Sequence, residues 1–108
     1  MVSIDVFRKL ALSFEGAAEQ PHFERTSFRA GKIFATLDEK NSLACLVLSP
    51  VDQSVFCAFD KSVIYPVPNK WGKQGATYFN LKKVRKDMLK DAMTQAYERA
   101  VIKRNSKK

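Results

Sequence analysis

The sequence predicts an α+β domain in which helices pack against an antiparallel β-sheet. Apolar residues recur every three or four positions over residues 3–14 and 84–103, which is the period of an amphipathic helix. Between these segments the period changes to two, most clearly over residues 28–37, as expected of half-buried strands. The connections between the expected strands are of hairpin length, and strands and helices do not alternate strictly, which favours the α+β class.

The first element is a helix over residues 3–14. Ser3 is placed to cap its N-terminus, and Gly16 follows its last turn. One face of this helix is apolar, so we expect it to pack on the sheet. That face consists of Phe7, Leu10, Ala11 and Phe14.

Three strands in a meander follow. Residues 28–30 and 33–37 carry apolar side chains at alternating positions on either side of Gly31, which can adopt the positive φ of a tight turn. A second turn at residues 38–41 leads into residues 43–48, a third strand that is apolar on both faces.

A short middle helix and two more strands come next. Ser49 and Pro50 are typical of a helix start, so we expect a helix from Pro50 to Phe59. Prolines and glycines then predict a short strand near residues 63–65, an irregular loop, and a last strand over residues 76–81.

The long C-terminal helix, residues 84–103, is the clearest element. Its continuous apolar face consists of Met88, Leu89, Ala92, Met93, Ala96, Tyr97, Ala100 and Val101. With 108 residues the chain predicts one domain, residues 1–103, followed by a basic tail, residues 104–108.

The net charge of +8 is concentrated at the C-terminal end. Residues 82–108 hold 10 basic and 3 acidic residues, whereas residues 1–81 hold 9 and 8. This asymmetry suits a polyanionic partner. The longest apolar run, residues 43–48, is too short to span a bilayer, and the first ten residues do not resemble a secretory signal, so we expect a cytoplasmic protein without membrane association.

Little in the sequence favours an enzyme. His22 is the single histidine and has no nucleophile beside it in sequence, so we interpret it as a surface loop residue before the first strand. Cys45 and Cys57 lie in apolar surroundings and are expected to be buried free thiols, and one histidine hardly supplies a metal site. The stretch GKQGAT, residues 72–77, lacks the spacing and the following helix of a phosphate-binding loop. We therefore expect no catalytic residue, cofactor or metal.

The C-terminal helix is not expected to enter a DNA groove, because Asp87, Asp91 and Glu98 lie opposite its apolar face. The remaining bases are interleaved with aromatic residues around Trp71, where lysines could hold phosphates and exposed rings could stack on bases. In the alternative interpretation Trp71 and Phe79 belong to the core and the lysines are only solvated.

Several motifs together resemble the MmcQ/YjbR-like family over nearly the whole chain. They are PHF with SFR near residues 21–29, GKIFATL at residues 31–37, and WGKQGAT at residues 71–77. The resemblance implies a fold with two projecting β-hairpins, the so-called double wing, and a DNA-binding function. Ala76 departs from the bulkier, often aromatic residue of the family pattern.

The hypothesis from these observations is a small, non-enzymatic, monomeric protein that binds DNA through basic β-hairpin wings with little sequence preference. The alternative is a protein-binding or small-ligand-binding module in which the Trp71 loop forms the pocket or groove. The nucleic-acid-binding residues expected from the resemblance and from the basic segments are Arg29, Lys32, Lys70, Trp71, Lys73, Gln74, Thr77, Lys82 and Lys83.

Overall fold

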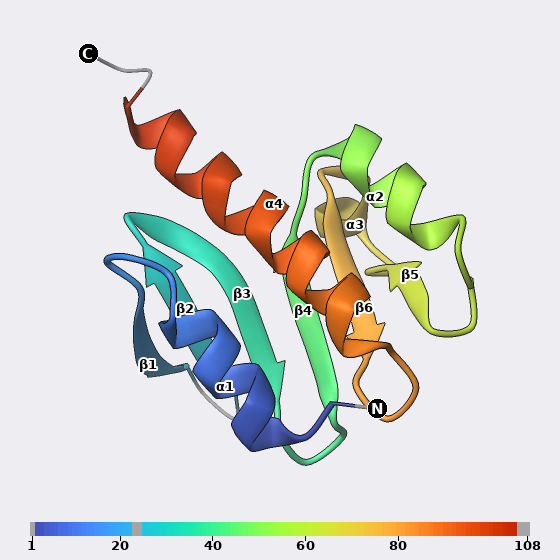
Figure 1. The fold of residues 1–108 in the computed structure, drawn as a ribbon. Coiled ribbons are helices and arrows are strands. Elements are labelled where there is room, and N and C mark those ends of the chain that lie inside the picture. Colours follow the sequence, from blue (N-terminus) through green and yellow to red (C-terminus); the bar gives the residue numbers. More distant parts are fainter. Residues whose placement is uncertain (1, 23–24, 106–108) are drawn as a thin grey trace.

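The computed structural model describes residues 2–22 and 25–105, with the backbone alone described for residues 22 and 102–105 (Figure 1). Within these residues the α+β class is confirmed: six strands form one antiparallel sheet in the order β1-β2-β3-β4-β6-β5. The elements are α1 (Ile4–Leu12), β1 (Ala18–His22), β2 (Arg25–Ala30), β3 (Lys32–Asp38), β4 (Leu43–Val47), α2 (Pro50–Cys57), β5 (Ile64–Pro66), α3 (Lys70–Lys73), β6 (Ala76–Asn80) and α4 (Lys86–Asn105).

The predicted starts of the first two helices are confirmed by their caps, whereas the C-terminal helix begins at Lys86 and not at residue 84. The Oγ of Ser3 accepts a hydrogen bond from the backbone N–H of Val6 at 3.1 Å, and the Oγ of Ser49 accepts one from Asp52 at the same distance. These hydroxyls satisfy backbone donors that have no partner inside the helix. The β2–β3 turn is also as expected, with Gly31 at φ 83°.

Two elements differ from the sequence prediction. Residues 18–22, taken as the approach to the first strand, form the edge strand β1, so His22 lies in a strand rather than a loop. The side chain of His22 lies outside the described residues. The loop before the last strand contains the short helix α3. In addition, α4 continues to Asn105, so the first two residues of the predicted tail are helical and the rest lie outside the described residues.

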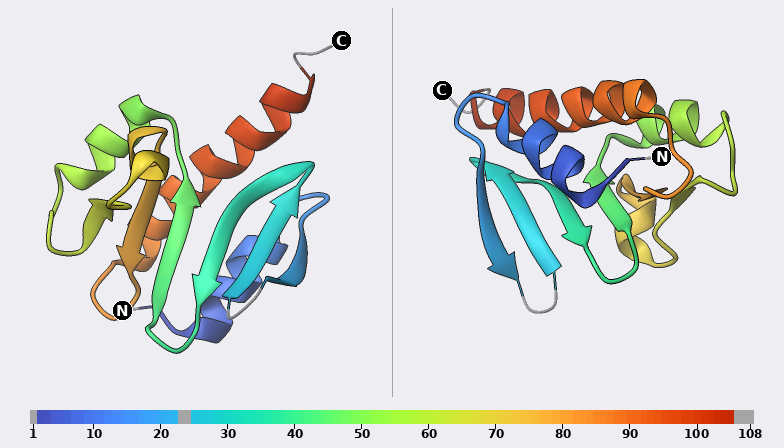
Figure 2. Two further views of the ribbon diagram at one scale, coloured as in Figure 1. Left: turned by 180° about the vertical axis from the view of Figure 1, so that it is seen from behind. Right: turned by 60° about the horizontal axis from the view of Figure 1, so that its bottom comes forward.

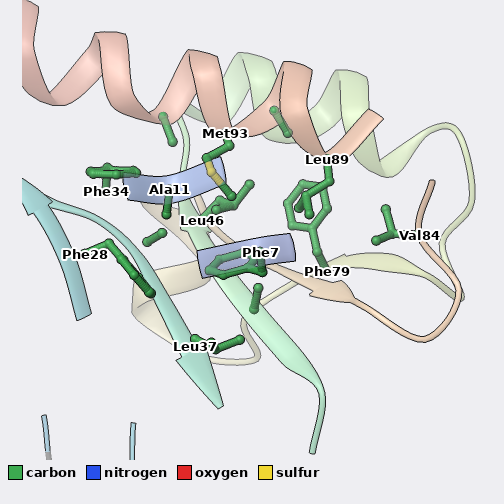
Figure 3. Close-up of a cluster of buried hydrophobic side chains, with 14 of the residues drawn as sticks. Phe7, Ala11, Phe28, Phe34, Leu37, Leu46, Phe79, Val84, Leu89 and Met93 are labelled. Atoms are coloured by element: carbon green, nitrogen blue, oxygen red, sulfur yellow. The ribbon is translucent and has the colours of Figure 1, made fainter. Parts of the chain in front are cut away.

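The core lies between the sheet and the helices α1 and α4 (Figure 3). Phe34 is fully buried and meets the ring of Tyr97 on α4 edge-to-face, with 5.7 Å between ring centroids. Phe7 of α1 packs in the same way on Phe28 of β2 at 5.6 Å. The predicted apolar face of α4 is confirmed, since its members from Met88 to Val101 are buried or half-buried.

The helices α1, α2 and α4 all lie on the same side of the sheet (Figure 2, right). Among the residues that the structure describes, only the segment around α3 covers part of the opposite side, at one end (Figure 2). The strand β4 is therefore buried on one face, through Ala44 and Leu46, and only half-buried on the other, through Leu43, Cys45 and Val47. We would expect a strand that is apolar on both faces to be covered on both faces. The face of β4 that carries Leu43, Cys45 and Val47 departs from this expectation.

Candidate nucleic-acid interface

A single row of side chains crosses the uncovered face of the sheet. Register pairs connect Ser27 of β2 to Thr36 of β3, Thr36 to Cys45 of β4, Cys45 to Tyr78 of β6, and Tyr78 to Tyr65 of β5. Because opposed residues of a sheet point to the same face, these five side chains lie side by side. The rings of Tyr65 and Tyr78 meet edge-to-face at 5.7 Å.

Trp71 stands at the end of this face where β6 begins. Its side chain is 58% exposed, so the interpretation that placed Trp71 in the core is wrong, whereas Phe79 is fully buried as that interpretation expected. Burial of an indole is strongly favourable in free energy, so a tryptophan exposed to this extent is unusual. Exposed aromatic residues of this kind often mark a binding surface.

The backbone that carries Trp71 is held firmly. Asn69 caps α3 by accepting the Trp71 N–H through its Oδ1 at 2.8 Å, and Gln53 of α2 donates from its Nε2 to the carbonyl of Gly72 at 2.8 Å. A Cβ at Gly72 would lie 1.8 Å from the carbonyl oxygen of Val67. The glycine thus allows two backbone segments to touch beneath the exposed indole.

Two hollows border the Trp71 segment. The first, which we call the sheet-face hollow, has a volume of about 450 Å³. The second lies between α2 and the segment before α3, with a volume of about 530 Å³, and includes Gln53, Lys70 and Lys73 in its lining. The sheet-face hollow is lined by Arg25, Thr36, Cys45, Val47, Val67, Asn69, Trp71, Ala76 and Tyr78.

The charges around the sheet-face hollow are positive. Arg25 belongs to its lining, and Lys70 and Lys73, the neighbours of Trp71 in α3, line the second hollow; all three are exposed. Arg29 follows Ser27 at the alternate position on the uncovered face and donates from Nη1 to Gln20 Oε1 at 3.3 Å. The described residues that line either hollow beside Trp71 include no acidic side chain. Arg25 was not among the sequence candidates, although it shares the alternation of Ser27 and Arg29.

The other predicted nucleic-acid-binding residues lie in different parts of the structure. Lys82 and Lys83 lie beyond the far end of β6, at the opposite end of the sheet from Trp71. Lys32 borders a small hollow on the helix side together with Ala96 and Arg99 of α4. Gln74 is exposed and directly follows α3.

Thr77 is a correction to the predicted set. Its side chain is fully buried, donates from Oγ1 to the carbonyl of Gly75 at 2.8 Å, and accepts from Nε2 of Gln53 at 3.2 Å. Thr77 pairs with Leu46 on the covered face, so it supports the α3 segment from within and is not accessible to a ligand.

The glycine-containing stretch at residues 72–77 does not offer its amides to an anion. The backbone N–H groups of Gly72, Gln74 and Gly75 donate to the carbonyls of Asn69, Trp71 and Gly72. A phosphate-binding loop requires N–H groups that point at the ligand. Contacts with an anion here would therefore come from side chains.

The thiols are free, as Cys45 and Cys57 form no disulfide. Burial raises the pKa of the Cys45 thiol, so this group is held in its neutral, weakly nucleophilic form. Within the described part of the chain, no three histidine, cysteine, aspartate or glutamate side chains gather as a metal site would require.

No protein-family model and no curated protein matches the sequence. A comparison of structures finds the Deinococcus radiodurans protein DR2400, whose crystal structure contains a domain of the family DUF419. The fold is shared. The TM-score is 0.75 with 18% sequence identity over 89% of this chain and 76% of that chain. DUF419 is the YjbR/MmcQ-like family, and the predicted α+β fold with an antiparallel sheet, an N-terminal helix and a long C-terminal helix is confirmed. The described strands form one continuous sheet, and the two projecting hairpins implied by the resemblance stay a prediction. Among the described helices, none has the length and apolarity needed to cross a bilayer.

Proposed function

We propose that this chain is a cytoplasmic, non-enzymatic member of the MmcQ/YjbR-like family that binds nucleic acid as a monomer. The observation that carries the proposal is the exposed indole of Trp71, held on a rigid support between Lys70 and Lys73 beside a hollow without acidic lining residues. Arginine side chains of β2 complete a basic rim around the uncovered sheet face.

Phosphate contacts would supply most of the affinity. Lys70, Lys73, Arg25 and Arg29 are all exposed, and each could neutralise one phosphate. Four such contacts predict a dependence of log K on log salt of about −3.6 for duplex DNA, or a roughly 150-fold loss of affinity between about 50 and 200 mM salt. Contacts to the backbone carry no sequence information, so sequence preference would be small.

The test is fluorescence anisotropy with a labelled duplex of about 20 base pairs at these two salt concentrations. The variant Lys70→Ala/Lys73→Ala is expected to reduce the steepness of the salt dependence by about 2 and to weaken binding equally for unrelated sequences.

The matched control is Lys82→Ala/Lys83→Ala. It removes the same two charges but at the opposite end of β6, so the salt dependence should stay close to that of the wild type. Equal effects of the two double variants would mean that only net charge matters. Absence of binding at about 50 mM salt would refute the proposed function.

The alternative is a protein-binding module, and one observation favours it. Val51 and Val55 of α2 and the following Phe59 are exposed large hydrophobic residues spaced four positions apart. Exposed apolar stripes of this kind mark protein interfaces. A Val55→Asp variant that loses a partner captured by the wild type, while retaining DNA binding, would support this alternative.

A further inference from the structure

We infer that the sheet-face hollow receives unpaired bases, so that single-stranded nucleic acid is the preferred substrate and Trp71 and Tyr78 are the stacking surfaces. This inference rests on the proposed function and names its substrate class. It replaces duplex DNA, which the sequence favoured, by a strand whose bases are free to leave the stack.

The lining of the sheet-face hollow is suited to a base and not to a phosphate. Val47, Val67 and Ala76 give it an apolar surface, and Trp71 and Tyr78 contribute aromatic rings. Its volume of about 450 Å³ lies within the roughly 300–1,000 Å³ of sites that enclose small organic groups. Base–aromatic stacking uses such surfaces and tolerates every base, because each base has a π-face.

Ala76 is the residue that leaves this space open. It pairs with Val47 of β4 on the uncovered face, between the Trp71 segment and Tyr78. A longer side chain at this position would extend into the hollow, since neighbouring strands hold opposed Cβ atoms only about 5 Å apart.

The charges lie where a sugar–phosphate backbone would pass. Arg25 enters the lining from β2, and Lys70 and Lys73, the neighbours of Trp71 in α3, line the adjoining hollow on the α2 side. A strand crossing the sheet face could therefore place bases on the aromatic rings with one phosphate against Arg25, and its continuation past Trp71 could reach the lysines of the adjoining hollow. Paired bases of a duplex stack on each other and do not present their faces to protein side chains, so a duplex would use only the rim.

Few groups in the hollow could read the edge of a base. Asn69 already uses its Oδ1 to accept the Trp71 N–H, and we assign Arg25 to a phosphate. The remaining polar groups of the lining are the amide nitrogen of Asn69, the hydroxyls of Thr36 and Tyr78, and the neutral thiol of Cys45. With so few donors and acceptors, discrimination among bases should be weak.

The experiment compares three probes of about 12 nucleotides, a length within the known range of single-strand sites. They are oligo(dT), oligo(rU), and oligo(dT) annealed to oligo(dA), each titrated at about 50 mM salt. Trp71 is the single tryptophan of the chain, so its fluorescence reports directly on the proposed contact. We expect tighter binding of a single strand than of the duplex, with quenching of the indole by the single strand. The two single-stranded arms decide between DNA and RNA as the source.

Two variants locate the contact. Their affinities are measured by fluorescence anisotropy of labelled probes, because neither variant retains a tryptophan. Trp71→Ala should weaken single-strand binding by roughly 5- to 150-fold, the loss expected for one stacked base, whereas Trp71→Phe should retain most of it. Since Trp71 is exposed, both variants should fold. Ala76→Phe should fill the hollow and reduce single-strand affinity while leaving duplex affinity unchanged.

Duplex binding equal to or tighter than single-strand binding, with unquenched fluorescence and an unaffected Trp71→Ala variant, would overturn this inference and leave the proposed function intact. Failure of every probe to bind would overturn both. If Ala76→Phe does not fold, the comparison of Trp71→Ala with Trp71→Phe still decides the matter.

Discussion

The two faces of the sheet differ in what covers them. On the covered face, Phe34, Leu46 and Phe79 are fully buried beneath α1, α2 and α4. On the other face, Cys45 and Tyr78 are only half-buried and line a hollow together with Arg25. Both faces belong to the same strands, so the difference arises from alternate residues of one sequence.

This difference separates the face that stabilises the fold from the face to which we assign the proposed function. The covered face has close packing and aromatic contacts, which hold the fold. The uncovered face retains apolar and aromatic surface exposed to water, which contributes less to folding and is available to a partner. If this view is correct, substitutions on the two faces should have opposite consequences.

The largest expected effect is on the covered face. Phe34→Ala removes a fully buried ring that contacts Phe14 and Tyr97, and should lower the free energy of unfolding by about 3–5 kcal/mol. Urea denaturation measures this change. The same measurement on Trp71→Ala should show a change within about 0.5 kcal/mol, because exposed positions rarely contribute more. Comparable losses for the two variants would remove the distinction between the faces.

The next effect concerns the support of the uncovered face. Gly75 has φ 115°, and a Cβ there would lie 1.7 Å from the carbonyl oxygen of Leu48. Gly16 also has positive φ, at 79°, but a Cβ there would meet nothing within 4 Å. Gly16→Ala should therefore cost about 1–2 kcal/mol from backbone conformation alone, and Gly75→Ala should cost more. Thermal unfolding compares the two. Equal costs would show that the contact with Leu48 relaxes easily.

The smallest effect is a dependence of stability on pH from Cys45. Burial raises the pKa of this thiol in the folded state, so above the ordinary cysteine pKa of about 8.5 the folded protein binds more protons than the unfolded chain. Stability should then fall as pH rises past that value, by less than about 1.4 kcal/mol per pH unit. The pKa of Cys57 is raised too, so the comparison is made in a Cys57→Ala background, with and without Cys45→Ala. Parallel pH profiles would contradict the assignment.

Much of the covered face could be predicted from the sequence. The spacing of Phe7 and Ala11, the alternation around Gly31 and the apolar face of α4 each have a period that matches one secondary structure. The strand β1 was not predicted because it contains Pro21, which lacks an N–H and is a poor strand former. An edge strand such as β1 tolerates a proline. The helix α3 has four residues, too few for any period to emerge.

The candidate site was harder to predict. The same alternation that buries Phe79 also buries Thr77, two residues earlier, so its exclusion from the site could have been deduced. Arg25 lies four residues before Arg29 in β2, so its position on the same face of the sheet could likewise have been deduced. The exposure of Trp71 could not be deduced from the sequence. It depends on a hydrogen bond from Gln53, which is distant in sequence, and on a close backbone contact at Gly72, which lies in an irregular segment.

The central claim is that the uncovered face binds nucleic acid. The most direct test follows the backbone amide resonances of the isotopically labelled protein by NMR while oligo(dT) is added. We expect the amide resonances of Thr36, Cys45, Tyr78 and α3 to shift and those of α4 to stay unchanged. Shifts confined to α4 or to the segment of Lys82 and Lys83 would contradict this claim.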